Sequence, residues 1–396
     1  MRRWNARLGL LSFGHFTVDA YSSFFTPLLP LLVAKLDLSL TRVGTLVAFM
    51  SLASSMSQPL FGLFSDRMRH PWFIALGPLA AAVFISGLGM APNYGSLVAL
   101  LMLGGFGVAA FHPQAASLAG EASPSRGMAM AWFVTAGTLG FALGPLLAVG
   151  LVHVAGLERS WLAAIPGVII SVFMLTVIGK VRPVHKAPSE RPRLAELRPM
   201  LRPLLLLYFA VVSRSAVSYG FLTFLPLQLT QRGYSVVQAG GVVSLYLACG
   251  AIGGFFGGWL ADRWGGRRVV VASFLGAVPL YFLFLFAPDP WGLTSLVLGS
   301  FVLQTSLPVN VVMGQELSPR HASTISSLLM GAAWGLGALL IGPIGALADR
   351  WSIQWALFSL AFLLLGGLFC AIALPIQGRH AEPVEVGQPV SSAAGR

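Results

Sequence analysis

A few ionisable residues stand inside long apolar stretches of the sequence, where a charge is costly. Asp19 and His15 lie four residues apart in the stretch from Leu10 to Leu32, so on a helix they share one face. Placing a charged residue at the centre of a bilayer costs about 2.5–3.5 kcal/mol on insertion scales. Residues that bear this cost indicate a polar interior, where a carboxyl beside an imidazole can load and release a proton. The alternative for Asp19 is helix packing, with its carboxyl bonded to Ser22 or Ser23.

Arg214 is the one basic residue inside an apolar stretch of the second half of the chain. Its guanidinium keeps its charge at any working pH and therefore needs a partner. The sequence leaves two partners open, which are Asp19 across the interior and an anionic substrate. A guanidinium binds a phosphonate, phosphate or carboxylate with two hydrogen bonds, so either partner suits it chemically.

His112 is the remaining ionisable candidate, and Pro113 follows it directly. Proline lacks the N–H that closes a helix turn, so a backbone carbonyl is freed next to this histidine. Packing is the competing interpretation for His112, as it is for His15.

The composition identifies the kind of protein that positions these residues. Hydrophobic residues make up 56% of the 396 residues and charged residues 10%, with a mean hydropathy of +0.80. Soluble domains carry about 25% charged residues, so the chain is predicted to be an all-α integral membrane protein. The net charge of +12 does not indicate a nucleic-acid partner, because the basic residues lie in short loops between apolar spans.

The apolar stretches predict twelve transmembrane helices. Their expected ranges are 8–33, 43–65, 72–91, 95–119, 128–153, 160–180, 203–229, 236–261, 269–287, 292–315, 322–348 and 353–376. The chain is therefore expected to divide into an N-terminal bundle (1–180), a Pro- and Arg-rich linker (181–202), a C-terminal bundle (203–377) and a disordered tail (378–396).

The distribution of basic residues predicts the orientation in the membrane. If both termini are cytoplasmic, 19 of the 25 Lys and Arg residues fall in cytoplasmic segments and five in outer loops. Cytoplasmic loops of membrane proteins carry such an excess. We therefore expect a multi-pass membrane protein with both ends in the cytoplasm.

The two halves repeat. Residues 62–67 (GLFSDR) recur as residues 258–263 (GWLADR) at an offset of 196, and Pro30 recurs as Pro226 at the same offset. Two six-helix halves related by duplication are typical of transporters whose binding site lies near the midplane between them. The sequence thus predicts two pseudo-symmetric six-helix bundles.

The repeated loop carries the pattern G-x-x-x-D-R-x-G-x-R-R from Gly258 to Arg268, and the chain resembles the major facilitator superfamily in it. The first copy departs from the pattern at residues 68–71. Within the superfamily, the chain resembles the fosmidomycin-resistance branch of drug exporters. That resemblance rests on Gly14-His15 with Asp19, Phe111-His112-Pro113, Ser213-Arg214-Ser215, Phe224-Leu225-Pro226 and Gln315-Glu316-Leu317.

The resemblance implies that spans 1, 4, 7 and 10 line a central cavity, where His15 and His112 could approach each other. We expect Asp19, His15 and His112 to couple transport to protons. The residues expected to bind substrate are Arg214, Tyr219, Gln304 and Asn310. Those expected to form an inner gate are Asp66, Arg67, Asp262, Arg263, Arg267, Glu121 and Glu316.

These features predict a secondary transporter that exports a small anionic drug or metabolite, such as a fosmidomycin-like phosphonate, in exchange for protons. The alternative is a proton-coupled uptake symporter for an organic acid or sugar. We expect no cofactor, because no ATP-binding loop occurs, and no enzyme activity, because the remaining histidines are scattered. The expected partners are protons, a small substrate and the bilayer, with a monomer as the working unit.

Overall fold

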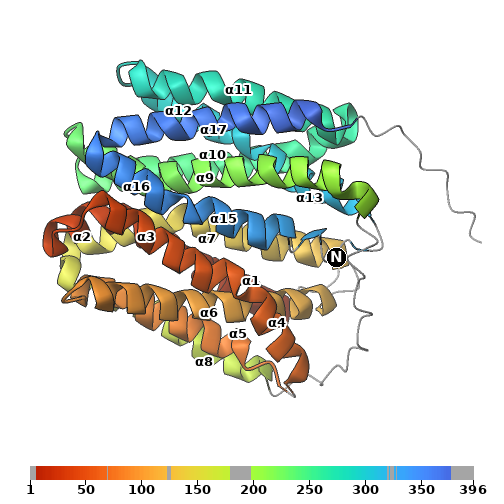
Figure 1. Cartoon of the computed structure of the whole chain (residues 1–396). Coiled ribbons are helices and arrows are strands. Elements are labelled where there is room, and N and C mark those ends of the chain that lie inside the picture. The colour runs from red at the N-terminus through yellow and green to blue at the C-terminus, as the bar shows by residue number, and fades with distance from the viewer. Residues whose placement is uncertain are drawn as a thin grey trace, which may run out of the picture.

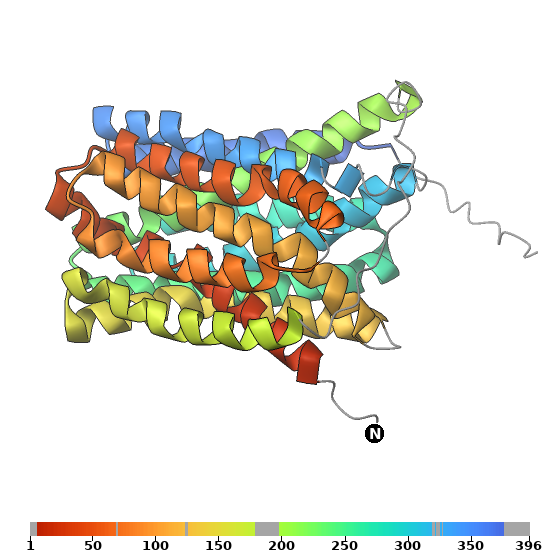
Figure 2. The same ribbon diagram turned by 90° about the horizontal axis from the view of Figure 1, so that it is seen from below.

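In the computed structural model, the chain is a bundle of long helices that run side by side (Figures 1 and 2). The structure describes residues 6–68, 70–122, 126–178, 198–318, 321, 325–326 and 328–375, without the side chains of Asp66, 126–128 and 177–178. These residues contain 12 helical segments long and apolar enough to cross a membrane, and no β-strand. The predicted all-α fold with twelve spans is confirmed.

The N-terminal half contains spans 1 to 6, several of which are built from two or three helical pieces. In chain order its main pieces are α1 (Ala6–Ser22), α2 (Leu29–Leu36), α3 (Leu40–Ser51), α4 (Gln58–Arg67), α5 (Phe73–Ala80), α6 (Tyr94–Glu121), α7 (Arg126–Ala155) and α8 (Ala164–Ile178). Span 1 is interrupted by a 3-10 turn at Thr26–Leu28, because Pro27 and Pro30 have no N–H to offer the helix. A π-helical turn at Leu52–Met56 joins α3 to α4 within span 2.

The C-terminal half contains spans 7 to 12. Its main pieces are α9 (Leu201–Gln231), α10 (Val236–Trp264), α11 (Gly266–Phe286), α12 (Trp291–Gln304), α13 (Ser306–Leu317), α15 (Ala333–Leu339), α16 (Ile341–Arg350) and α17 (Ile353–Ala373). Span 10 is interrupted at Thr305, three residues before Pro308. Most of the predicted linker and all of the tail lie outside the described residues, so these domain boundaries stay predictions.

An even number of spans brings the two ends of the bundle's chain to one face. We call the face where α1 begins and α17 ends the terminal face, and the opposite one the distal face (Figure 1). The loops at 37–39 and 232–235 lie on the distal face, since each follows an odd-numbered span.

The two halves are tied together near the distal face. There α3 packs on α16 so closely that a Cβ on Gly44 would collide with the backbone of Ile341. Likewise α7 packs on α10, and the Leu146 N–H donates to Ser244 Oγ at 3.0 Å. Spans 2 and 8 are equivalent in the repeat, as are spans 5 and 11, so the two interfaces are related by the same pseudo-symmetry. Toward the terminal face, α4 diverges from α15 (Figure 1).

Candidate functional site

Asp19 lies between two histidines in the N-terminal half. His15, one turn earlier on α1, brings its Nε2 to 3.3 Å from Asp19 Oδ2. His112 on α6 brings its Nε2 to 3.0 Å from Asp19 Oδ1. The two imidazole rings meet edge to face with centroids 5.0 Å apart. The predicted approach of the two histidines is thus seen, and we call these three residues the triad.

Each histidine of the triad is also fixed from its other side. Nδ1 of His15 lies 2.8 Å from the Phe133 carbonyl oxygen on α7, and its ring stacks on the Phe133 ring with centroids 4.1 Å apart. Nδ1 of His112 lies 2.7 Å from the Val108 carbonyl oxygen, one turn earlier on α6. A second contact on each ring fixes its orientation and its tautomer.

Close packing of α7 on α1 makes the triad compact. A Cβ on Gly137 would lie 2.5 Å from His15 Nε2 and 2.7 Å from Asp19 Oδ2, so only glycine fits without displacing them. One and two turns further on, Gly140 meets the Phe16 backbone, and Gly144 meets Ser23 and the Ala20 backbone. Small residues at this spacing let two membrane helices approach closely.

The triad is buried but not sealed. The side chain of Asp19 is 18% exposed, that of His112 23% and that of His15 9%. The hydroxyls of Ser22 and Ser23 donate to backbone carbonyls, so neither of them binds the Asp19 carboxyl. Each of the two contacts between a histidine Nε2 and an Asp19 oxygen, at 3.3 and 3.0 Å, is short enough for a shared proton. The three donor atoms, within 4.8 Å of one another, are also the nearest approach to a metal-binding set among the described residues.

Arg214 occupies the C-terminal half and is 3% exposed. Its guanidinium donates to Gln304 Oε1 at 3.0 Å and to Ser215 Oγ at 3.2 Å, and it lies 5.3 Å from the centre of the Trp334 ring. Its Nε is buried without a hydrogen-bond partner among the described residues. All of these neighbours are neutral, so the positive charge is solvated but not compensated.

The structure distinguishes between the two partners that the sequence left open for Arg214, which are Asp19 and an anionic substrate. Within the described part of the chain, no carboxylate oxygen lies within 4.0 Å of the guanidinium nitrogens, and Asp19 is paired with the two histidines instead. A structural ion pair between Asp19 and Arg214 is therefore absent from this conformation.

The other three residues expected to bind substrate differ in how they relate to Arg214. Gln304 on α12 contacts it directly and also reaches Ser218 Oγ at 3.4 Å. Tyr219, which lies five residues beyond Arg214 on α9, interacts with Ser55 of the N-terminal half. Asn310 on α13 is 1% exposed, and both its amide atoms lack a partner among the described residues.

The predicted gate residues lie at the terminal face and form no ion pair between the halves among the side chains described there. Arg267 instead binds the end of α17 in its own half, donating to Leu374 O at 2.7 Å and Ile372 O at 2.5 Å. Arg263 stacks on Trp259, with its guanidinium carbon 4.0 Å from the ring centre. The exposed members are Arg67, Glu121, Asp262, Arg263 and Glu316. The Asp66 side chain lies outside the described part.

Asp349 is a functional candidate that the sequence analysis missed. Its carboxylate accepts from the Leu40 N–H at 2.7 Å, and from the N–H and hydroxyl of Thr41 at 2.8 and 2.6 Å. It thereby caps the first turn of α3 from the opposite half of the protein. A signal existed, because Asp349-Arg350 repeats the Asp-Arg pair that ends spans 2 and 8. Trp334, which faces Arg214, had no such signal.

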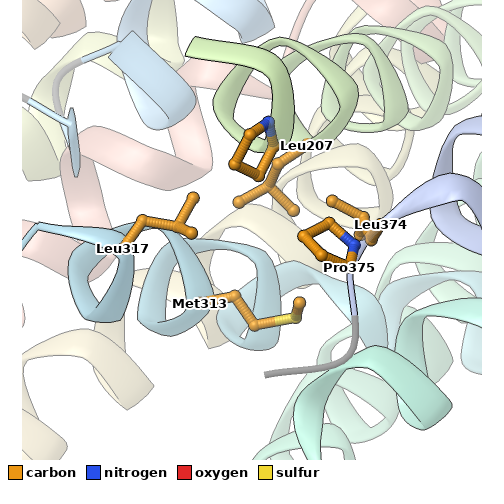
Figure 3. Close-up of a pocket in the computed structure, with 6 residues that line it drawn as sticks. Leu207, Met313, Leu317, Leu374 and Pro375 are labelled. Carbon is orange, nitrogen blue, oxygen red and sulfur yellow. The ribbon is translucent and has the colours of Figure 1, made fainter. Parts of the chain in front are cut away.

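Two hollows lie away from these residues. A crevice of about 10 Å³ near the terminal face is apolar, as Figure 3 shows for Leu207, Met313 and Leu317. A hollow of about 750 Å³ opens between α2, α7 and α10, where His153 lines it. None of the predicted proton, substrate or gate residues lines either one.

Comparison with known proteins agrees with the fold. The family model described as Major Facilitator Superfamily matches residues 11–342 and 208–391. The chain is 28% identical over 387 residues to the fosmidomycin resistance protein of Escherichia coli (strain K12), covering 95% of this chain and 94% of that one. It is 28% identical over 382 residues to an uncharacterised transporter, YfnC, of Bacillus subtilis (strain 168), covering 91% and 90%.

More distant matches include a probable hexose phosphate transport protein of Chlamydia pneumoniae, 23% identical over 401 residues and covering 89% of this chain and 86% of that one. Among solved structures, a bacterial homologue of the human lysosomal transporter Spinster, inward-facing and unoccupied, superimposes with a TM-score of 0.77. It is 15% identical and covers 94% of this chain and 97% of that one. The chain is thus a multi-pass membrane transporter that belongs to the major facilitator superfamily.

Proposed function

We propose that this protein exports a small anionic drug or metabolite, such as a fosmidomycin-like phosphonate, across a bacterial inner membrane in exchange for protons. The observation that carries the proposal is the division of charge between the two halves. The N-terminal half holds a carboxylate between two histidines, whereas the C-terminal half holds an arginine with only neutral neighbours. The first can exchange protons, and the second requires an anion.

The proposed cycle uses these two elements in turn. An anionic substrate enters from the cytoplasm and takes two hydrogen bonds from Arg214, with Gln304 and Tyr219 beside it. Protons then reach Asp19 and the histidines from outside and drive the return step. One proton entering down the membrane potential supplies about 2.3 kcal/mol per 100 mV. The similarity to the fosmidomycin resistance protein supports export as the direction.

The orientation in the proposal places both termini, and so the terminal face, in the cytoplasm. It is supported by the excess of Lys and Arg in the loops of that face. The structure is closed at the distal face, where Asp349 caps α3 across the two halves. With this orientation the closed distal face is the outer one. The gate residues Asp66 and Asp262 would then pair between the halves only after the terminal face closes.

Uptake in symport with protons is the second candidate, favoured by the similarity to a probable hexose phosphate transport protein. Arg214 suits a phosphate ester as well as a phosphonate, so the residues alone do not separate the two functions. The direction of the proton gradient that drives accumulation separates export from uptake. An antiporter accumulates substrate in vesicles with an acidic interior, and a symporter does so with an acidic exterior, however the protein is inserted.

The test is therefore transport into proteoliposomes, with radiolabelled fosmidomycin and a panel of phosphonates, sugar phosphates and organic acids as probes. We expect accumulation of at least one anion when the interior is acidic, and none when the gradient is reversed. Accumulation under an acidic exterior would support uptake instead. Transport that ignores both gradients would contradict proton coupling in either direction.

A further inference from the structure

We infer that the triad of His15, Asp19 and His112 binds two exchangeable protons, one in each contact between a ring Nε2 and a carboxylate oxygen. The inference rests on the proposed function, which requires these residues to exchange protons but does not say how many. The number follows from which ring nitrogen of each histidine is already occupied.

The Nδ1 atom of each histidine already carries a hydrogen. A backbone carbonyl oxygen can only accept a hydrogen bond, so the ring nitrogen that faces it must carry the hydrogen. Nδ1 of His15 faces the Phe133 carbonyl at 2.8 Å, and Nδ1 of His112 faces the Val108 carbonyl at 2.7 Å. Each neutral ring therefore has a bare Nε2, with its lone pair directed toward Asp19.

The two bare nitrogens face different oxygens of one carboxylate. His15 Nε2 faces Oδ2 at 3.3 Å, and His112 Nε2 faces Oδ1 at 3.0 Å. Without a proton, each contact sets a nitrogen lone pair against an oxygen lone pair, and one proton turns it into a hydrogen bond. The proton belongs to the pair of groups and not to either residue. With both contacts filled, the triad carries a net charge of +1, with one filled it is neutral, and with none it carries −1.

On the side that faces α7, the surroundings offer these atoms no other hydrogen-bond partner. Gly137 of α7 stands against His15 Nε2 and Asp19 Oδ2, where even a Cβ does not fit, so water cannot enter from that side. The Phe133 ring covers His15.

Few other titratable groups belong to the helices that pack on α1. The described side chains of α5, of α8 and of the turn at Ala81–Ile85 include none. On α6 and α7, besides His112, the described titratable side chains lie at the helix ends: Tyr94, Glu121 and His153. On α1 itself, Arg7 lies in the first turn, and Tyr21 donates to the Ala163 carbonyl at 2.5 Å.

The inference is tested by solid-state NMR of the full protein in lipid vesicles, with ¹⁵N-labelled histidine and ¹³C-labelled aspartate. H15Q and H112Q assign the two rings, and exposed His153 serves as the reference. We expect both triad rings to keep the Nδ1 hydrogen at high pH, whereas His153 favours the Nε2–H form of free histidine. Lowering the pH should then add two protons to the triad as a whole, shared between the Nε2 atoms and the Asp19 carboxyl.

Two results would overturn the inference: a neutral triad ring that carries its hydrogen on Nε2, or uptake of a single proton by the three residues over the titration. The experiment needs no substrate, so its outcome is separate from that of the proposed function. Two bound protons in a protein that shows no proton-driven transport would overturn the proposed function and leave the proton count intact.

Discussion

His112 Nε2 lies 3.0 Å from Asp19 Oδ1, although 93 residues separate the two in the chain. The contact joins α6 to α1 within the N-terminal half, and it leaves Arg214 of the other half without a carboxylate partner in the described part of the protein. The proposed mechanism depends on this separation. A proton site and an anion site in different halves can be occupied in turn as the halves move against each other.

Arg214→Gln should weaken substrate binding without unfolding the protein. Hydrogen bonds to charged groups contribute about 1.5–3 kcal/mol, so we expect the concentration for half-maximal transport to rise about tenfold or more. For Arg214→Lys, this concentration should lie between those of wild type and Arg214→Gln, since lysine keeps the charge but cannot form two parallel hydrogen bonds. The measurement is concentration-dependent uptake of the transported anion into proteoliposomes.

The matched control for Arg214 is Arg232→Gln, which removes an arginine from a loop of the distal face, 3.9 Å from Asp289. It should leave the half-maximal concentration unchanged, because a surface ion pair contributes little. Equal effects of the two glutamine variants would contradict a binding role for Arg214.

Gly137→Ala should alter the pH dependence of transport more than it alters stability. The added methyl group meets the ends of the His15 and Asp19 side chains, which can shift, and so disturbs the contacts that hold the protons. Gly140→Ala is the comparison, because its methyl group collides with the backbone of Phe16. Overpacking of that kind costs about 1–3 kcal/mol, so we expect a lower Tm and an unchanged pH profile for the remaining activity.

Measuring Tm and the pH profile for both glycine variants separates the two roles. If Gly137→Ala lowered Tm as Gly140→Ala does and left the pH profile of wild type, Gly137 would act in helix packing alone.

Asp349→Asn should shift the protein toward conformations that are open at the distal face. An asparagine keeps one acceptor for the first turn of α3 but loses the charge, and helix caps contribute about 0.5–2 kcal/mol. Distances between spin labels at Arg42→Cys and Trp351→Cys, measured by pulsed EPR with Cys249 and Cys370 replaced by serine, should show a larger population of separated labels. Distance distributions identical to those of the protein with Asp349 intact would contradict a role of Asp349 in holding the two halves together.

The fold was accessible from the sequence because membrane insertion imposes a strong length and polarity pattern on every span. His15 and Asp19 were accessible because their spacing of four residues fixes a common face. The placement of His112 beside them depended on resemblance to a family, since no local pattern connects α6 to α1.

Several contacts of the site carried no usable signal in the sequence. Phe133 acts on His15 through a backbone carbonyl, which any residue type could supply. Gln304 lies 90 residues from Arg214, and Trp334 resembles any other aromatic residue of a span. The prediction left the partner of Arg214 open because Asp19 and an anionic substrate both match its charge. Only the packing of α1 against α6 and α7 shows that Asp19 is paired with the two histidines.

The most direct test of proton coupling is the Asp19→Asn variant in proteoliposomes with an acidic interior. An amide cannot exchange protons in this pH range, so we expect no accumulation of the anion that wild type accumulates. Exchange of labelled for unlabelled substrate should persist, because Arg214 is intact. Asp37→Asn, at a left-handed position of the distal face that asparagine also tolerates, should behave as wild type. Accumulation by Asp19→Asn at the wild-type level would contradict the account.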